Sequence, residues 1–417
     1  MSVLPIILHF LIIPFVFYAF KKKSLTTWIL TSMLLGIIVG IDFPEFSIQL
    51  KFVSKIFLRL VKTIVAPLIF ATLVVGIAGH SNIKQLGRLG WKSILYFEVV
   101  TTLALFIGLA AINITKAGIG VQLPTSTEKL EIPAPKTAVE HIVDIFPENI
   151  AKSIADGNVL QIVVFSILFG IGLALINGKH KTIMLDFTES LAEVMFKFTK
   201  IIMYFAPIAV GCAMAYTVGH TGLDVLKHLF KLVGTLYIAL IVFVFLVLLP
   251  IALFFKIKFI KLAKVIAEPV SIAFATTSSE SALPKLMKAL EEFGVPRKIV
   301  SFVLPMGYSF NLDGTTLYLS LATIFVAQVS HIDLSFAQQI TILLTLMLTS
   351  KGVAGVPRAS LVILMGTAAS FGLPTEPIFL ILGVDELMDM ARTSVNVIGN
   401  SLATVVIAKT EGELIEA

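Results

Sequence analysis

Long apolar runs constrain this chain more than any other feature of its sequence. We predict apolar helical segments at roughly 27–44, 52–79, 90–115, 158–177, 188–220, 228–256, 298–330 and 374–409. Because about 20 apolar residues cross a bilayer as a helix, several of these segments are long enough to span it. Only 14% of the 417 residues are charged, against about 25% in an average soluble domain. The chain is therefore predicted to be an all-α, polytopic protein of the cell membrane.

The positive charges lie in short stretches between the apolar runs, at 21–23, 84–92, 179–181 and 256–264. These are alternate loops, as expected for the cytoplasmic side of a membrane protein. The net charge of +6 therefore reflects topology, and we expect the lipid bilayer, not nucleic acid, as partner. The polar segment 116–155 is expected outside the cell. The single cysteine, Cys212, excludes a disulfide within the chain and a cysteine-based metal site.

Residues 1–23 form a hydrophobic extension that ends in three lysines. In a cleaved signal peptide the positive charge precedes the apolar run, whereas here it follows the run. We therefore favour an uncleaved extra helix or interfacial anchor, followed by a transporter domain at 24–417.

Two segments, 268–290 and 341–370, each have two apolar arms that are too short to cross a bilayer alone. Their tips, TTSSESALP and TSKGVAGVP, are rich in small and polar residues. This pattern is typical of re-entrant helical hairpins, with an ordinary loop between short helices as the alternative.

Each hairpin is followed by an apolar helix with a polar stretch, SFNLDGTT at 309–316 and SVNVIGNS at 394–401. We predict that both helices are interrupted there, which makes hairpin and broken helix an inverted repeat. Interrupted helices in corresponding places of two halves mark the binding site of a transporter. Helix N-termini there offer N–H groups to an anion, and unwound backbone offers carbonyl oxygens to a cation.

Four polar residues of the last apolar run, Asp389, Arg392, Asn396 and Asn400, are spaced by three, four and four residues. This spacing places them on one face of a helix. A charge at the centre of a membrane helix costs about 2.5–3.5 kcal/mol on insertion scales. A simple ion pair would account for Asp389 and Arg392 but not for the two amides. We favour a ligand site in which arginine holds a carboxylate and aspartate holds an ammonium group.

Other polar residues suggest ion coupling. The stretch Asn311–Thr316 offers hard oxygen ligands suited to Na⁺, with a plain helix break as the alternative. Glu98, within an apolar run, is a candidate proton carrier, or else a buried acid bonded to nearby hydroxyls. Glu280 in the first hairpin tip is a second candidate. The serines around it lack a catalytic base, so we do not expect an enzyme.

Five motifs, YFEVVTT, TTSSESALP, GYSFNLDGTTLY, SKGVAGVP and DMARTSVNVIGN, follow one another across residues 27–413. In type and order they resemble the glutamate transporter family, the dicarboxylate/amino acid:cation symporters, and above all its bacterial proton/sodium-glutamate branch. The resemblance implies eight transmembrane helices, two re-entrant hairpins and a homotrimer that works as an elevator. The scaffold would be about 27–79 and 158–256, and the mobile transport domain about 90–115 and 257–410.

The resemblance also implies site residues. Asp389 would hold the substrate amino group, and Arg392 its side-chain carboxylate. The substrate-binding set would be Thr277, Ser278, Ser279, Thr315, Val356, Ser360, Asp389, Arg392, Thr393 and Asn396. The sodium ligands would be Thr101, Thr102, Asn311 and Asp313 at one site; Ser309, Ser350, Lys351 and Val353 through their backbones at another; and Gly307, Asn311, Asn396 and Asn400 at a third. No cofactor is implied beyond Na⁺ or H⁺ as coupling ions.

The chain departs from the family in three places. Asn400 stands where sodium-driven members have an aspartate, and Glu280 replaces a tip serine. Arg358 follows Val-Pro, where glycine is usual, and we hypothesise that it pairs with Glu280 or Asp389.

The presence of both Asp389 and Arg392 favours glutamate or aspartate as the substrate of a Na⁺- or H⁺-coupled symporter. The C4-dicarboxylate branch lacks the acid, and the neutral amino acid branch lacks the arginine. The alternatives are a C4-dicarboxylate symporter and an anion-conducting channel or sensor of the same fold.

We predict that Arg392→Cys or Arg392→Thr shifts preference from acidic towards neutral amino acids, because the carboxylate loses its positive partner. Competition of neutral and acidic amino acids for uptake would measure the shift. Unchanged acidic selectivity would count against the role given to Arg392.

Overall fold

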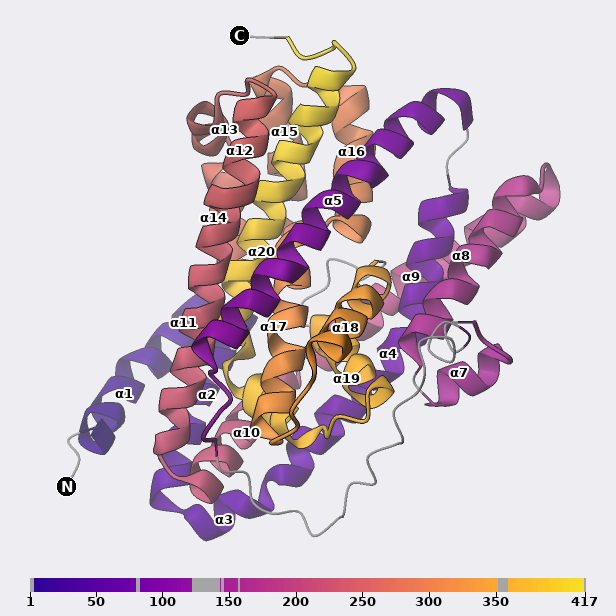
Figure 1. The fold of residues 1–417 in the computed structure, drawn as a ribbon. Helices are drawn as coiled ribbons and strands as arrows, with labels where there is room; N and C mark the ends of the chain where they lie inside the picture. Colours follow the sequence, from indigo (N-terminus) through magenta and orange to yellow (C-terminus); the bar gives the residue numbers. More distant parts are fainter. Residues whose placement is uncertain are drawn as a thin grey trace.

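The computed structural model describes residues 4–79, 83–121, 143, 146–156, 158–351 and 359–415. Within these ranges the regular structure is helical, with no β-strand, and most long helices run roughly along one axis (Figure 1). The helices up to the bend after Met203 are α1 (Leu4–Lys22), α2 (Leu25–Asp42), α3 (Pro44–Gln49), α4 (Lys51–Ala78), α5 (Ile83–Thr115), α7 (Ile150–Asp156), α8 (Val159–Leu175) and α9 (Lys179–Met203). The remaining helices are α10 (Ala206–Thr221), α11 (Asp224–Phe243), the π-helical turn η1 (Val244–Leu248), α12 (Leu249–Phe254), α13 (Phe259–Val265), α14 (Ala267–Thr276), α15 (Ser279–Phe293), α16 (Arg297–Phe310), α17 (Asp313–Val329), α18 (Phe336–Thr349), α19 (Ala359–Ser370) and α20 (Glu376–Thr410). The all-α prediction is confirmed.

Five helical stretches in the described part of the chain are long and apolar enough to cross a membrane. They are Leu25–Asp42, Pro44–Ala78, Leu89–Thr115, Asp224–Phe254 and Arg297–Val329. Lys179–Met203 and Ala206–Thr221, bent by 47°, form a sixth if they are one span. Large apolar side chains on these helices point outward, as expected of a surface that faces lipid. The chain is a multi-pass membrane protein, and the figure of eight spans stays a prediction.

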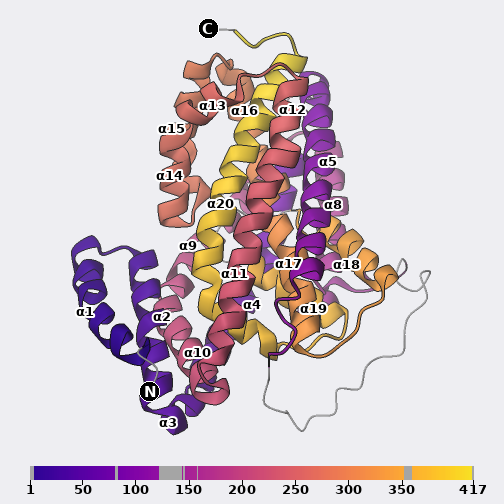
Figure 2. The same ribbon diagram turned by 60° about the vertical axis from the view of Figure 1, so that its left-hand side comes forward.

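The predicted N-terminal helix forms as α1, which packs beside α2 (Figure 2). It ends where Lys23 adopts a left-handed backbone, with φ of 51°. Ser24 then caps α2 by accepting a hydrogen bond from the Thr27 N–H at 3.2 Å. Whether α1 crosses the bilayer stays a prediction.

The two predicted hairpins form as neighbouring helix pairs. α14 and α15 pack together and against α20, joined by a tip where Thr277 has φ of 51° and Ser278 caps α15. α18 begins at a capping box made by Ser335 and Gln338 and packs on α19. The two pairs lie in opposite halves of the molecule along its long axis (Figures 1 and 2). Their re-entry into the membrane stays a prediction.

Only one of the two predicted helix interruptions is present. α16 ends at Phe310 and α17 begins at Asp313, which confirms the break at NLDG. The break predicted at 394–401 is wrong, because α20 is continuous from Glu376 to Thr410. Asn396 bonds to the start of α17 and Asn400 bonds to Asn311 in the break, while the backbone of α20 stays helical. Gly399 serves close packing, since a Cβ there would lie 1.8 Å from Asp313 Oδ2.

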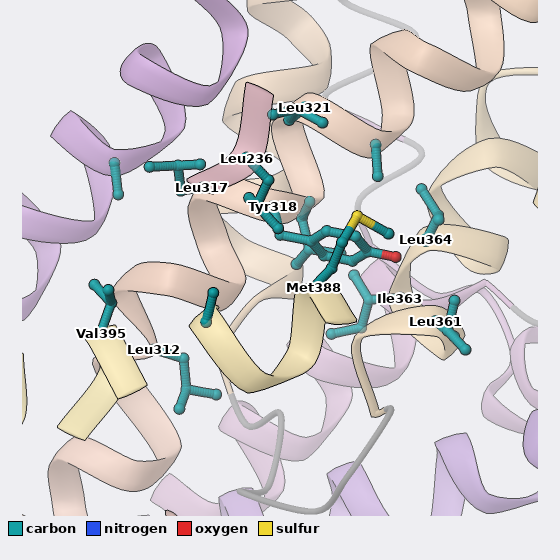
Figure 3. Packing of buried hydrophobic residues seen from close by; sticks show 14 of the residues in the cluster. Leu236, Leu312, Leu317, Tyr318, Leu321, Leu361, Ile363, Leu364, Met388 and Val395 are labelled. Atoms are coloured by element: carbon teal, nitrogen blue, oxygen red, sulfur yellow. The ribbon is translucent and has the colours of Figure 1, made fainter. Parts of the chain in front are cut away.

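The buried core centres on α17 and α20. Nearly every residue of α17 is buried, although such a helix in a membrane could have faced lipid on one side. Figure 3 shows the apolar side chains around Tyr318, which come from α11, α17, α19 and α20. This packing places the polar face of α20 in the interior of the protein.

We predict that Gly399→Ala lowers stability by about 1–3 kcal/mol, because the added methyl group overlaps the Asp313 carboxylate. The midpoint of thermal unfolding in detergent would measure this loss. Gly234→Ala in α11 is the matched control, because a Cβ there meets nothing within 4 Å and alanine favours a helix. Equal midpoints for the two variants would contradict the prediction.

Candidate functional site

The guanidinium group of Arg392 lies in the centre of the protein, with 1% of the side chain exposed. Its Nε donates to Asp389 Oδ1 at 2.9 Å, and its Nη1 donates to Asp385 Oδ1 at 2.9 Å. Its Nη2 lies 3.4 Å from the second oxygen of Asp385. The three residues belong to α20, and the spacing of three and seven residues places them on one face. Two carboxylates therefore compensate one buried guanidinium.

The Tyr318 ring covers the guanidinium, whose Cζ lies 4.2 Å from the ring centroid. Arginine stacked on a desolvated aromatic ring gains a cation–π attraction. Tyr318 is itself fixed by the apolar core in Figure 3. Thr393 Oγ1 donates to Asp389 Oδ1 at 3.0 Å and holds that carboxylate from the other side. Arg392 and Asp389 are thus pre-positioned.

Asn396 of α20 caps the first turn of α17. Its Oδ1 accepts hydrogen bonds from the Gly314 N–H at 2.8 Å and the Thr315 N–H at 3.2 Å, and its Nδ2 donates to Thr315 Oγ1 at 3.0 Å. The first N–H groups of a helix have no partner within the helix. The side-chain oxygen of Asn396, on the neighbouring helix α20, is the hydrogen-bond acceptor for two of these N–H groups. Thr315 and Asn396, both predicted to bind the substrate, are therefore in direct contact.

A second amide, Asn400, bridges the break between α16 and α17. Its Nδ2 donates to the Asn311 carbonyl oxygen at 3.1 Å, and its Oδ1 accepts from Asn311 Nδ2 at 3.3 Å. Asn311 Nδ2 also lies 3.2 Å from Asp313 Oδ2. Gly307 lies against Asn400, since a Cβ there would be 2.0 Å from the amide oxygen. The predicted residues Gly307, Asn311, Asp313 and Asn400 form one cluster.

Two oxygens of this cluster, Asn311 Oδ1 and Asp313 Oδ1, are buried without a hydrogen-bond partner in the part of the chain that the structure describes. A buried polar atom without a partner costs free energy, and a hard cation would supply one. Amide and carboxylate oxygens are suitable ligands for Na⁺. The observed residues therefore fit the predicted cation site.

Lys351 reaches the same region from the end of α18. Its Nζ donates to Thr101 Oγ1 at 2.8 Å, lies 3.1 Å from Glu98 Oε2, and contacts the Phe310 carbonyl oxygen at 3.3 Å. The sequence analysis gave Lys351 only a backbone role. The predicted proton carrier Glu98 is therefore the partner of a lysine and not an isolated acid.

The hairpin tips contribute further predicted residues. Thr277 and Ser279 are buried at the first tip, Ser278 is half-buried, and Glu280 is exposed. Near the second tip, the hydroxyls of Ser350 and Ser360 are buried without a hydrogen-bond partner among the described residues. Thr102 and Ser309 are half-buried. The predicted residues Val353 and Val356, and Arg358 with its hypothesised pairing, lie outside the described residues.

Three side chains of this region were not predicted from the sequence, those of Asp385, Tyr318 and Lys351. Asp385 stands two helical turns before Arg392 and shares its face, so the helical spacing was a sufficient signal for it. Tyr318 lies one turn after Thr315, where an aromatic residue in an apolar helix resembles core packing. No local pattern indicates where the long side chain of Lys351 ends.

Residues 25–410 match the sodium:dicarboxylate symporter family. The chain is 44% identical to the proton/sodium-glutamate symport protein of Geobacillus stearothermophilus over 94% of this chain and 96% of that protein. It is 43% identical to the proton/glutamate-aspartate symporter of Bacillus subtilis (strain 168), over 94% of this chain and 95% of that protein. It is also 43% identical to the C4-dicarboxylate transport protein of that organism, over 95% of each chain.

We predict that Asn396→Ala lowers stability by about 1–3 kcal/mol, because two buried N–H groups at the start of α17 lose their acceptor. Asn396→Asp keeps an acceptor oxygen and is expected to lose less stability than Asn396→Ala. The midpoint of thermal unfolding would rank the variants. Ser394→Ala is the matched control on α20, since among the described residues the Ser394 hydroxyl bonds only to the Met390 carbonyl oxygen of the same helix. A loss from Ser394→Ala as large as that from Asn396→Ala would refute the capping role.

Proposed function

Because this chain belongs to the sodium:dicarboxylate symporter family, we propose that it takes up glutamate and aspartate by secondary active symport with Na⁺, H⁺ or both. It is a multi-pass protein of the cell membrane and a transporter, not an enzyme. Its relatives named as proton/sodium-glutamate and glutamate-aspartate symporters support the substrate class and the coupling ions.

The buried group of Arg392, Asp385 and Asp389 carries this proposal. One guanidinium faces two carboxylates, so the group has a formal excess of one negative charge. An ammonium group would balance that charge at Asp389, and the guanidinium offers a planar fork to a carboxylate. Glutamate and aspartate carry both groups.

We assign the substrate roles accordingly. Asp389, with Thr393, would take the amino group, and Arg392 the side-chain carboxylate beside Thr315. Asn396 and the backbone at Ser279 would take the main-chain carboxylate. Thr277, Ser278, Ser360 and Val356 would enclose the ligand from the two hairpin tips.

The coupling ions are cargo that travels with the substrate. The Asn311 and Asp313 oxygens that lack hydrogen-bond partners support a sodium site with Thr101 and Thr102. We keep the backbones of Ser309, Ser350, Lys351 and Val353, and the group of Gly307, Asn311, Asn396 and Asn400, as two further candidate sites. Glu98 and Glu280 remain the candidates for carrying a proton.

We propose that the transport mechanism is an elevator within a homotrimer, with eight membrane spans and two re-entrant hairpins. α2 packs on α10, and α4 on α8 and α9, as a scaffold would. α5 and α14 to α17 pack with α20, as a mobile body would. The expected scaffold at 158–256 included α11, but its packing against α5 and α20 supports moving it to the transport body.

A C4-dicarboxylate substrate is the second candidate, because a relative with that name is as similar to the chain as the glutamate-aspartate symporter. A pure anion channel is less favoured, since it would not need an arginine already neutralised by carboxylates.

The test is uptake of labelled glutamate into vesicles that contain the purified protein, under either a sodium gradient or a pH gradient. Accumulation above the outside concentration under one of them supports a symporter, and its driving gradient names the ion. Equilibration of glutamate across the vesicle membrane without accumulation would indicate a channel and would contradict the proposal. Succinate, offered under the same gradients, tests the second candidate.

We predict that Asp389→Ser weakens glutamate and aspartate binding roughly 10- to 100-fold, because a charge-assisted hydrogen bond to the ammonium is lost. Binding of succinate, which has no ammonium, should change far less. Competition by both ligands against labelled aspartate would measure the two effects. An equal loss for both would show that Asp389 acts only by holding Arg392.

A further inference from the structure

The ammonium group of Lys351 lies where a cation is expected to bind. The side chain is buried, with 11% exposed, and it reaches from the end of α18 towards α5 and the end of α16. Three oxygens surround its Nζ, those of Thr101, Glu98 and the Phe310 carbonyl, at 2.8 to 3.3 Å. An ammonium has three N–H donors, so this arrangement provides an acceptor for each.

Two of these partners belong to features that attract cations. Phe310 is the last residue of α16, and the carbonyl end of a helix carries a partial negative charge. Thr101 is a predicted sodium ligand, and its hydroxyl donates to the Phe97 carbonyl oxygen at 2.6 Å. Its oxygen therefore accepts from Lys351 with the lone pairs that would face a sodium ion.

The other side of the site is Asp313, whose Oδ1 is buried without a hydrogen-bond partner among the described residues. Two like charges repel each other more strongly inside a protein than in water. A sodium ion at Asn311 and Asp313 would meet the positive charge of Lys351 and would find Thr101 occupied.

We propose that Lys351 is a built-in cation of this site, and that its ammonium group and a sodium ion compete for the oxygen of Thr101. The inference rests on the proposed function only in taking sodium as the ion. Lys351 lies just after α18, so the competition links the end of this helix to the occupancy of the cation site. The backbone role predicted for Lys351 is separate and survives a change of its side chain.

The test is a sodium titration of the purified protein in detergent, without substrate and at constant ionic strength with choline. The midpoint of thermal unfolding reports binding, because a ligand that binds the folded state stabilises it. Lys351→Met keeps the length of the side chain and removes its charge. We expect its half-saturating sodium concentration to fall about tenfold or more below that of the parent protein, or a sodium effect to appear where the parent has none.

Lys351→Arg keeps the charge and should follow the parent protein. The double variant Lys351→Met, Thr101→Val also removes the Thr101 oxygen as a sodium ligand. We expect it to lose the increase in sodium affinity that Lys351→Met alone produces. If Lys351→Met does not fold, Lys351→Gln provides a second neutral side chain with the same expectation.

The competing interpretation is that Lys351 and Glu98 merely tie α18 to α5. In that case Lys351→Met lowers the unfolding midpoint in choline and leaves the half-saturating sodium concentration unchanged. That outcome would overturn the proposal. Glutamate uptake by the parent protein in vesicles is measured separately, so a failure of the transport function is distinguishable from a failure of the lysine competition.

Discussion

A guanidinium group buried between two carboxylates and an aromatic ring sets the conditions for the rest of this structure. A charge at the centre of a membrane helix is costly unless partners lie within the protein. Asp385 and Asp389 reach Arg392 because they stand seven and three residues before it on an unbroken helix. An interruption in this part of α20 would separate these partners. The ion group therefore requires an unbroken α20 in this region, and the break lies between the neighbouring helices α16 and α17.

A helix break inside a membrane protein leaves backbone groups that need partners. Asn396 and Asn400 provide them, by capping the start of α17 and by bonding to Asn311. Asn396 also donates to Thr315, a proposed substrate residue. Asn311, the partner of Asn400, also bonds to Asp313, a proposed cation ligand. A displacement of Asn311 would disturb both Asp313 and Asn400. The hydrogen bonds at the break thus connect the two parts of the proposed site, and they would give ion and substrate a physical route for influencing each other.

The sequence predicted much of this arrangement because its signals are local. The spacing of Asp389, Arg392, Asn396 and Asn400 defines one helix face, and Asn-Leu-Asp-Gly marks a break that does form. The second break was wrong because a polar stretch with a glycine is also what a helix needs for close contact with a neighbour, here Gly399 against Asp313. The position of Tyr318 at the site depends on the packing of α17 against α20, and that of the Lys351 side chain on the packing of α18 against α5. Helical spacing in the sequence carries no information about either packing.

The positions of the ion pairs are relevant to how the proposed transport body, which has charged side chains in its interior, could move against the scaffold. Arg392 finds its carboxylates on its own helix, and Lys351 finds Glu98 on α5 within the same proposed transport body. Lys92–Glu411, Lys298–Glu413 and Lys285–Glu268 also lie within that body. At the boundary with the proposed scaffold, the flexible side chain of Met214 on α10 packs against Gly383 of α20. Apolar contact is non-directional, so it can be exchanged during sliding, whereas an ion pair across the boundary would have to break in a low-dielectric medium. The charge pairs named here lie inside one proposed body, and the contact of Met214 with Gly383 at its edge is apolar, which is the arrangement that the proposed elevator movement would require.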